Sequence, residues 1–191
     1  MQTEKSAVAQ KKYKTIEQKD VVNHFNKNVS PKLWKKNEIQ YKAIFRMQLK
    51  VLKLYIDEKQ LHVDTKTWER MMRSFVYRLS IGYFGVGTQA GLSSGVFTKA
   101  TTVKGAKSTN DHLFGAVAIG KRIHDEFVKS NFDIEYMVEV WLPSNLFLWM
   151  TLKITIEEHS KDCVIRDGNT IEEKMNLLHY QNVSELMAKT I

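Results

Sequence analysis

The stretch that decides the fold lies in the last third of the chain and reads Leu146-Phe147-Leu148-Trp149-Met150-Thr151-Leu152-Lys153-Ile154-Thr155-Ile156. In its second half, polar and aliphatic residues alternate from Thr151 to Ile156. Successive side chains of a strand point to opposite faces, so the pattern predicts a strand with one buried and one exposed face. Helix-like segments surround this strand. We therefore expect an α+β fold with a helical, basic N-terminal half and a small mixed strand-and-helix C-terminal half.

Directly after this strand the chain carries a polar cluster, Glu157, Glu158 and His159. A carboxylate and an imidazole side by side are typical ligands of a divalent cation. The cluster is therefore a candidate half of a metal site. A turn at 166–169 follows, and Thr170 with Glu173 fits a capping box for a helix over about 171–180.

A second polar cluster lies at 104–112, between a β-like run over 96–103 and a helix-like run over about 114–130. We expect Asp111 and His112 to lie in the loop that enters this helix. A carboxylate holds a hard cation such as Mg²⁺, and an imidazole titrating near neutrality takes a proton from water. Asp111 would then be a metal ligand and catalytic residue, and His112 the general base. The alternative is that Ser108, Thr109 or Asp111 only caps the helix.

The two clusters together suggest one site. Asp111 would share a Mg²⁺ ion, or another divalent cation, with Glu158 or His159, which leaves His112 to activate water. Lys104 and Lys107 lie beside Asp111 in the sequence and suit a phosphate-bearing substrate.

The pattern of the N-terminal half predicts basic helices. Ser30 and Pro31 form a helix-start signal for a helix that reaches about Asp57, and a further helix opens at Asp64 or Thr65. We expect the first helix to track a phosphate backbone, although its lysines could equally form a solvated face opposite a core stripe. With the two lysines of the polar cluster, the predicted nucleic-acid contacts are Lys35, Lys36, Lys42, Arg46, Lys50, Lys104 and Lys107.

The 191 residues fit one domain. Within it we expect a basic arm over 1–28, a helical basic part over 29–80 and an α+β part over 81–191 that carries the site. Glycines are concentrated over 82–95, but no Gly-Lys-Ser/Thr phosphate loop occurs.

Charge and composition favour a polyanionic partner. The net charge is +8, with +13 in residues 1–130 and −5 in residues 131–191. A basic block of this kind suits nucleic acid, most simply DNA. The single cysteine, Cys163, excludes an intrachain disulfide. No run of about 18 apolar residues and no secretory signal occurs, so we expect a cytoplasmic protein without a membrane span.

The segment Thr109-Asn110-Asp111-His112, followed much later by Thr155-x-Glu157-Glu158-His159, resembles small phage-encoded homing endonucleases of the HNH, or ββα-metal, type. The resemblance covers roughly residues 104–180. It implies an Mg²⁺-dependent enzyme in a phage-infected cell, with a histidine that activates water and a metal ion that stabilises the leaving oxygen. The family pattern has Asn or a similar residue where this chain has His159.

The expected function is therefore metal-dependent DNA cleavage. A PD-(D/E)xK nuclease is a second enzymatic interpretation, with Glu139 and Lys153, but Thr151 occupies the place of its strand acid. The rivals are a non-enzymatic nucleic-acid-binding protein, such as a phage accessory or transcription factor, and an assembly protein with an acidic partner. The enzyme requires Asp111, His112 and Glu158 or His159 to converge, whereas a binding protein requires only a basic face.

Overall fold

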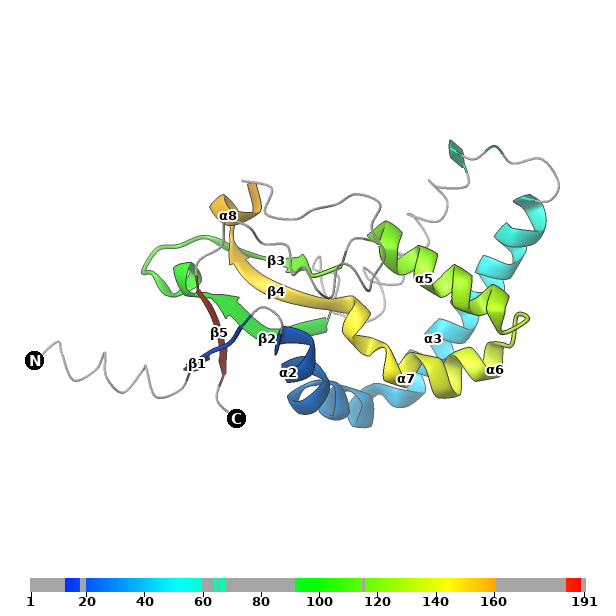
Figure 1. The fold of residues 1–191 in the computed structure, drawn as a ribbon, viewed down its shortest axis with the longest axis horizontal. Helices are drawn as coiled ribbons and strands as arrows, with labels where there is room; N and C mark the ends of the chain where they lie inside the picture. Colours follow the sequence, from blue (N-terminus) through cyan, green and yellow to red (C-terminus); the bar gives the residue numbers. More distant parts are fainter. Residues whose placement is uncertain are drawn as a thin grey trace, which may run out of the picture.

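The computed structural model describes residues 13–17, 20–59, 64, 66–67, 92–114, 116–160 and 185–189. It confirms the α+β fold class: long N-terminal helices precede a mixed five-stranded sheet with short helices. Figure 1 shows the sheet in the left half of the view and the helices α3, α5, α6 and α7 in the right half. Within the described residues, no helix is long and apolar enough to cross a membrane.

The described N-terminal part begins with strand β1 (Tyr13–Thr15) and helix α2 (Val21–Asn28). Apolar residues of α2, Phe25 among them, are buried in the core, so residues 13–17 and 20–28 of the expected arm belong to the fold. Helix α3 (Ser30–Lys59) starts where the Ser30-Pro31 signal predicts. Ser30 is the first helical residue itself and is buried, rather than lying outside the helix as a cap.

Two strands and a helix form the middle of the chain. Strand β2 (Leu92–Thr98) begins and ends earlier than predicted, and a 3₁₀ turn, η2 (Lys99–Thr102), follows it. Strand β3 (Ser108–His112) occupies the second half of the predicted loop. Helix α5 (Ala116–Lys129) confirms the helix predicted over about 114–130.

The chain then passes through short helical elements into the central strand. Trp149 ends the last of these elements. The alternation predicted for the central strand is observed only in part: Leu152 and Ile154 are fully buried and Lys153 is exposed, but Thr151 and Thr155, on the same face as Lys153, are buried as well. The elements are α6 (Ile134–Tyr136), the π-helical turn η3 (Met137–Trp141), α7 (Leu142–Ser144), the 3₁₀ turn η4 (Leu146–Trp149), β4 (Met150–Thr155), α8 (Ile156–Ser160) and β5 (Leu186–Lys189).

The sheet has the strand order β1-β5-β2-β4-β3. Strands β2 and β4 are parallel, and the other neighbouring pairs are antiparallel. One face is buried and carries Leu92, Val96, Leu152, Ile154 and Ala188. Helix α2 contacts β2 on the core side. The sheet therefore has a covered face and an open one, as antiparallel and mixed sheets commonly do.

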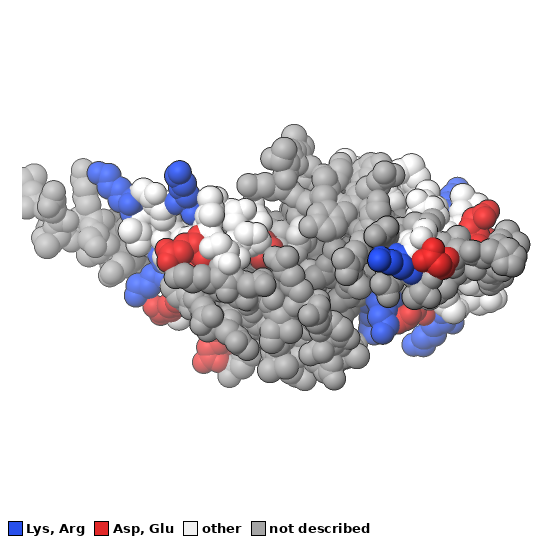
Figure 2. Space-filling model, turned by 90° about the horizontal axis from the view of Figure 1, so that it is seen from above, with Lys and Arg blue, Asp and Glu red and all other residues white. Residues whose placement is uncertain are grey.

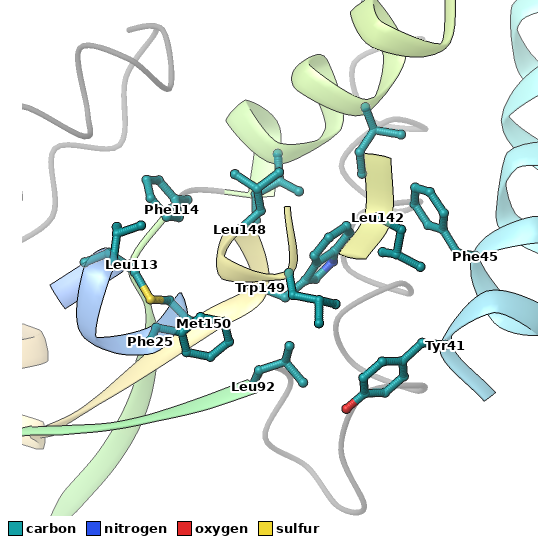
Figure 3. Packing of buried hydrophobic residues seen from close by; sticks show 14 of the residues in the cluster. Phe25, Tyr41, Phe45, Leu92, Leu113, Phe114, Leu142, Leu148, Trp149 and Met150 are labelled. Atoms are coloured by element: carbon teal, nitrogen blue, oxygen red, sulfur yellow. The ribbon is translucent and has the colours of Figure 1, made fainter. Parts of the chain in front are cut away.

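An aromatic cluster joins the sheet to α3. The rings of Phe45 and Trp141 are stacked with centroids 5.9 Å apart, and Trp149 meets both rings edge-on. Figure 3 shows Phe45 on α3 directed toward Leu142 and Trp149, with Phe25 and Met150 on the other side of the cluster. Such ring pairs add to the free energy gained by burying their area.

Several predictions fall on residues outside the described part. These are most of the helix expected from about 65 to 79, the glycine cluster over 82–91 and the helix over about 171–180. The start of the first of them is described: the Oδ1 atom of Asp64 accepts a hydrogen bond of 3.0 Å from the Thr67 amide, as an N-cap does.

Candidate functional site

Asp111 and His112 are the last two residues of strand β3, and not part of a loop entering a helix. All five residues of β3 pair with β4 in antiparallel register, with Asp111 opposite Leu152 and His112 opposite Thr151. Helix α5 begins only at Ala116, so the prediction that Ser108, Thr109 or Asp111 caps it is wrong. The backbone groups of this polar segment are satisfied by the ladder with β4, which the sequence of the segment alone does not reveal.

Because they are adjacent in a strand, Asp111 and His112 point to opposite faces of the sheet. Asp111 shares the face of Leu152, while His112 shares the face of Thr151. Burial lowers the pKa of His112, and the charge of Asp111 only partly opposes this effect. The predicted arrangement, in which His112 acts on a water molecule beside a metal ion held by Asp111, is therefore not formed.

Asp111 instead meets His159 from the second cluster. The Nδ1 atom of His159 lies 3.2 Å from Oδ2 of Asp111, across 48 positions of sequence. Helix α8 follows β4 directly and places His159 beside the edge strand β3. The side chain of His159 is 41% exposed and that of Asp111 is 17% exposed. The carboxylate thus orients a partly exposed imidazole ring.

Glu158, the other predicted ligand, has a structural role. Its Oε2 atom accepts hydrogen bonds from the Thr98 hydroxyl at 2.7 Å, the Thr155 amide at 2.8 Å and the Thr155 hydroxyl at 2.9 Å. The Thr155 hydroxyl in turn accepts from the Glu158 amide at 3.1 Å. This reciprocal pattern is a capping box at the start of α8. The sequence carries the signal for this box, Thr-x-x-Glu at 155–158, alongside the pattern that predicts a metal ligand at Glu158.

These residues provide only part of a metal-binding site. Across the described ranges, no group of three or more His, Cys, Asp or Glu side chains is placed to hold a metal ion. Asp111 and His159 supply one oxygen and one nitrogen ligand. Mg²⁺ is often held by one or two carboxylates with water and substrate phosphates as its remaining ligands. The pair therefore fits an ion that arrives with a phosphate-bearing substrate better than a resident one.

The predicted nucleic-acid contacts of α3 divide into two groups. Lys42 bonds Glu38 and Glu139, and Arg46 makes a two-pronged contact with Glu135 at 2.7 and 3.0 Å. These two cations hold α3 to α6 and η3. Lys35, Lys36 and Lys50 are exposed on the same helix. Glu139 is thus occupied by α3 and does not meet Lys153, as a PD-(D/E)xK site would require.

Lys104 and Lys107 are exposed in the connection between η2 and β3. The carbonyl of Lys107 accepts from the Ile156 amide at 3.0 Å, so this connection lies against the start of α8. Figure 2 shows basic and acidic side chains next to each other at both ends of the molecule. On the described surface seen in that view, the charges do not form one continuous basic field.

The open face of the sheet carries a row of residues that crosses all five strands. Register places Thr15, Met187, Phe97, Lys153 and Asn110 side by side, on β1, β5, β2, β4 and β3 in turn. All five are exposed or half-exposed, whereas on the three inner strands β5, β2 and β4 their neighbours along the strand, which point to the opposite face, are buried. We call this set the transverse row. None of its members is acidic, and its central residue, Phe97, lies next to Lys153.

Two further residues extend the transverse row. The ring of Tyr13 meets that of Phe97 edge-on, with centroids 5.0 Å apart, and Tyr13 pairs in register with the exposed Lys189. At the margin of this face, Glu185 accepts from the Thr15 hydroxyl at 2.7 Å and forms an ion pair with Lys99 at 3.1 Å. Its charge is therefore compensated, and Lys153 and Lys189 give the open face a positive sign.

Sequence reasoning missed this face. Strand β1 has three residues and strand β5 has four, which is too short for alternation to be recognised. The alternation of β4 predicts that Lys153 is exposed, but only the register shows which side chains lie next to it. Comparisons with family models, with curated proteins and with solved structures find no match for this chain. The resemblance to homing endonucleases thus rests on the two sequence motifs alone.

Proposed function

We propose that this chain binds nucleic acid through the open face of its sheet. The observation that carries the proposal is the transverse row, with Lys153 between Phe97 and Asn110. The overall charge of +8 supports the same class of partner. This is the non-enzymatic alternative to DNA cleavage. The sequence predicts its nucleic-acid contacts on helix α3, whereas we propose that they lie on the sheet.

The chemistry of the face suits unpaired bases. An aromatic side chain offers a π-surface on which a base stacks, typically worth about 1–3 kcal/mol per base. Lys153 and Lys189 supply positive charge for the phosphates, and Asn110 supplies amide groups for base edges. A broad sheet surface gives no element that enters the groove of a duplex. We therefore expect single-stranded DNA or RNA to bind more tightly than a duplex of the same length.

Binding is tested with a fluorescently labelled single-stranded oligonucleotide, titrated with protein while the anisotropy is followed. Lys153→Glu should weaken binding at least tenfold. The matched control is Lys129→Glu, because Lys129 is an exposed lysine on α5 and the change in net charge is identical. If the two variants lose affinity equally, only total charge matters and the open face is not the binding surface. If the wild-type chain binds no oligonucleotide at low salt, the proposal fails altogether.

The contact between Asp111 and His159 favours a second candidate, metal-assisted cleavage of phosphodiester bonds. His159 would accept a proton from the attacking water while Asp111 orients its ring, or both would bind Mg²⁺ together with a phosphate. Lys104 and Lys107 lie in the connection that packs against the start of α8, the helix that carries His159. The test is cleavage of plasmid and single-stranded DNA with Mg²⁺, with EDTA as the control. Cleavage that persists in EDTA would exclude a metal-dependent site.

A further inference from the structure

The outward face of helix α3 carries large apolar side chains. Ile39 is 87% exposed, Leu54 is 63% exposed and Met47 is 46% exposed. The helix is already anchored on its other side by Tyr41, Phe45, Leu49, Leu52 and Ile56, all of which are buried. A single exposed leucine needs no explanation, but a row of apolar residues on the face opposite the core does.

These residues form a stripe along the helix. At 100° per residue, Ala43, Met47 and Leu54 lie within about 40° of one another, and Ile39 lies at the border of the stripe. The stripe is directly opposite the line from Phe45 to Ile56. It is flanked by two charged ends: Lys32, Lys35 and Lys36 before it, and Asp57 and Glu58 after it.

We propose that the occupant of this stripe is a second copy of the same chain, packed through α3 in the antiparallel direction. Met47 lies 11 residues after Lys36 and 11 residues before Glu58. A two-fold axis close to Met47 therefore brings Lys36 of one copy to Glu58 of the other, twice in the dimer. The same axis brings Ile39 toward Leu54 of the second copy, since these residues lie eight before and seven after Met47.

Charge complementarity sets the direction. In a parallel arrangement the lysine end of α3 would face the lysine end of the second copy, and the acidic end would face the acidic end. The antiparallel arrangement places opposite charges together at both ends. Among the described residues, neither Lys36 nor Glu58 has an ion-pair partner within one chain. A symmetric contact of one surface with itself is the commonest way in which a protein dimerises.

The contact has the dimensions of an ordinary helix pair. From Lys36 to Glu58 the helix rises about 33 Å, and packed helices lie about 8–10 Å apart. Ala43 allows close approach near the axis, and the aliphatic stem of Lys50 covers apolar surface while its ammonium group remains in water. Lys42 and Arg46 are engaged with Glu135 and Glu139 and do not take part. The dimer is independent of the proposed nucleic-acid binding on the sheet.

The first experiment is sedimentation velocity of the whole chain over a hundredfold range of concentration. The wild type should show a concentration-dependent dimer. Met47→Glu places two like charges at the two-fold axis and should raise the dissociation constant at least tenfold. Val103→Glu is the control, because Val103 is an exposed apolar residue in the connection after η2. A wild type that stays monomeric throughout, or a dimer that Met47→Glu leaves unchanged, overturns the proposal.

The second experiment tests the direction of packing. Lys36→Glu alone should weaken the dimer several-fold, and the addition of Glu58→Lys should restore it, since the exchanged charges again face each other. In a Cys163→Ser background, Ile39→Cys and Leu54→Cys chains should cross-link to each other on mixing. Positions 39 and 54 are about 22 Å apart along the helix, so a short reagent distinguishes the directions. Cross-links between two chains that both carry Ile39→Cys, or no restoration by the charge exchange, overturn the antiparallel arrangement.

Discussion

His159 and Asp111 lie 3.2 Å apart although they come from different elements, the short helix α8 and the edge strand β3. His112, the direct neighbour of Asp111, points to the opposite face of the sheet. The residue that Asp111 can assist is therefore His159. Any phosphodiester chemistry of this chain is predicted to depend on that pair and not on His112.

If the second candidate function holds, His159→Ala should lower the rate of Mg²⁺-dependent cleavage by about 10²–10⁴-fold, as for loss of a general base. Asp111→Asn should lower the rate less, and excess Mg²⁺ or Mn²⁺ should restore part of it, because the amide still orients the ring but binds metal weakly. The measurement is initial rate against metal concentration. His112→Gln serves as the control and should retain activity. Loss of cleavage in His112→Gln with His159→Ala still active would reverse the assignment.

Glu158→Ala should destabilise the chain by about 1–3 kcal/mol, because it removes three hydrogen bonds inside the fold and leaves buried donors without their acceptor. Urea unfolding followed by circular dichroism measures this change. Glu157→Ala is the matched control: Glu157 is exposed on the same turn of α8, so the expected change is within about 0.5 kcal/mol. Equal effects of the two substitutions would mean that the capping box contributes nothing.

Stability should fall when the pH is lowered from about 7.5 to 5. Burial lowers the folded-state pKa of His112 from its ordinary value of 6.5, and that of His24 is also lowered by burial and by Lys14. As the pH falls, the unfolded chain therefore binds protons at a higher pH than the folded chain does. The contribution of these histidines to stability is fully present above pH 6.5 and is lost as the pH falls toward the folded pKa values. Melting temperature against pH should show a shallower slope in His112→Gln. An unchanged slope would exclude His112 as a contributor.

Lys42→Gln and Arg46→Gln should lower the melting temperature slightly and leave nucleic-acid affinity within about twofold, since their side chains bind Glu135 and Glu139. The effect on stability should shrink at high salt, which screens exposed ion pairs. Lys153→Glu should show the opposite pattern, with weak effects on stability and strong effects on binding. If Arg46→Gln weakens binding as much as Lys153→Glu does, α3 belongs to the binding surface.

Local periodicity explains why much of the fold is predictable from the sequence. The helical spacing from Tyr41 to Ile56 and the alternation in β4 each reflect burial of one face, which the residue types record directly. Strand β3 leaves no such record, because Ser108–His112 is polar throughout and forms a strand only through its ladder with β4. Pairing across the sheet is a property of two segments and cannot be read from either alone.

For the candidate site, the sequence predicts that Asp111 has a partner but not which of two adjacent residues this partner is. The sequence suggests that Asp111 meets Glu158 or His159, and the structure brings His159 to it while Glu158 turns inward to cap α8. Two consecutive residues of a helix point about 100° apart, so only one of them can face β3. A loop imposes no alternation of side chains, whereas strand β3 directs Asp111 and His112 to opposite faces of the sheet.

The position of β5 has a consequence for how the chain acquires its structure during synthesis. This strand, at residues 186–189, lies between β1 at residues 13–15 and β2, so it bridges the two. Until it has left the ribosome, β1 has no neighbour in the sheet and one side of β2 remains unpaired. Pairs such as Tyr13 with Lys189 give the sheet a high contact order, which slows folding. At 5–20 residues per second, synthesis of the residues from β2 to β5 takes about 5–20 s. During this time the unpaired edge of β2 can pair with other chains.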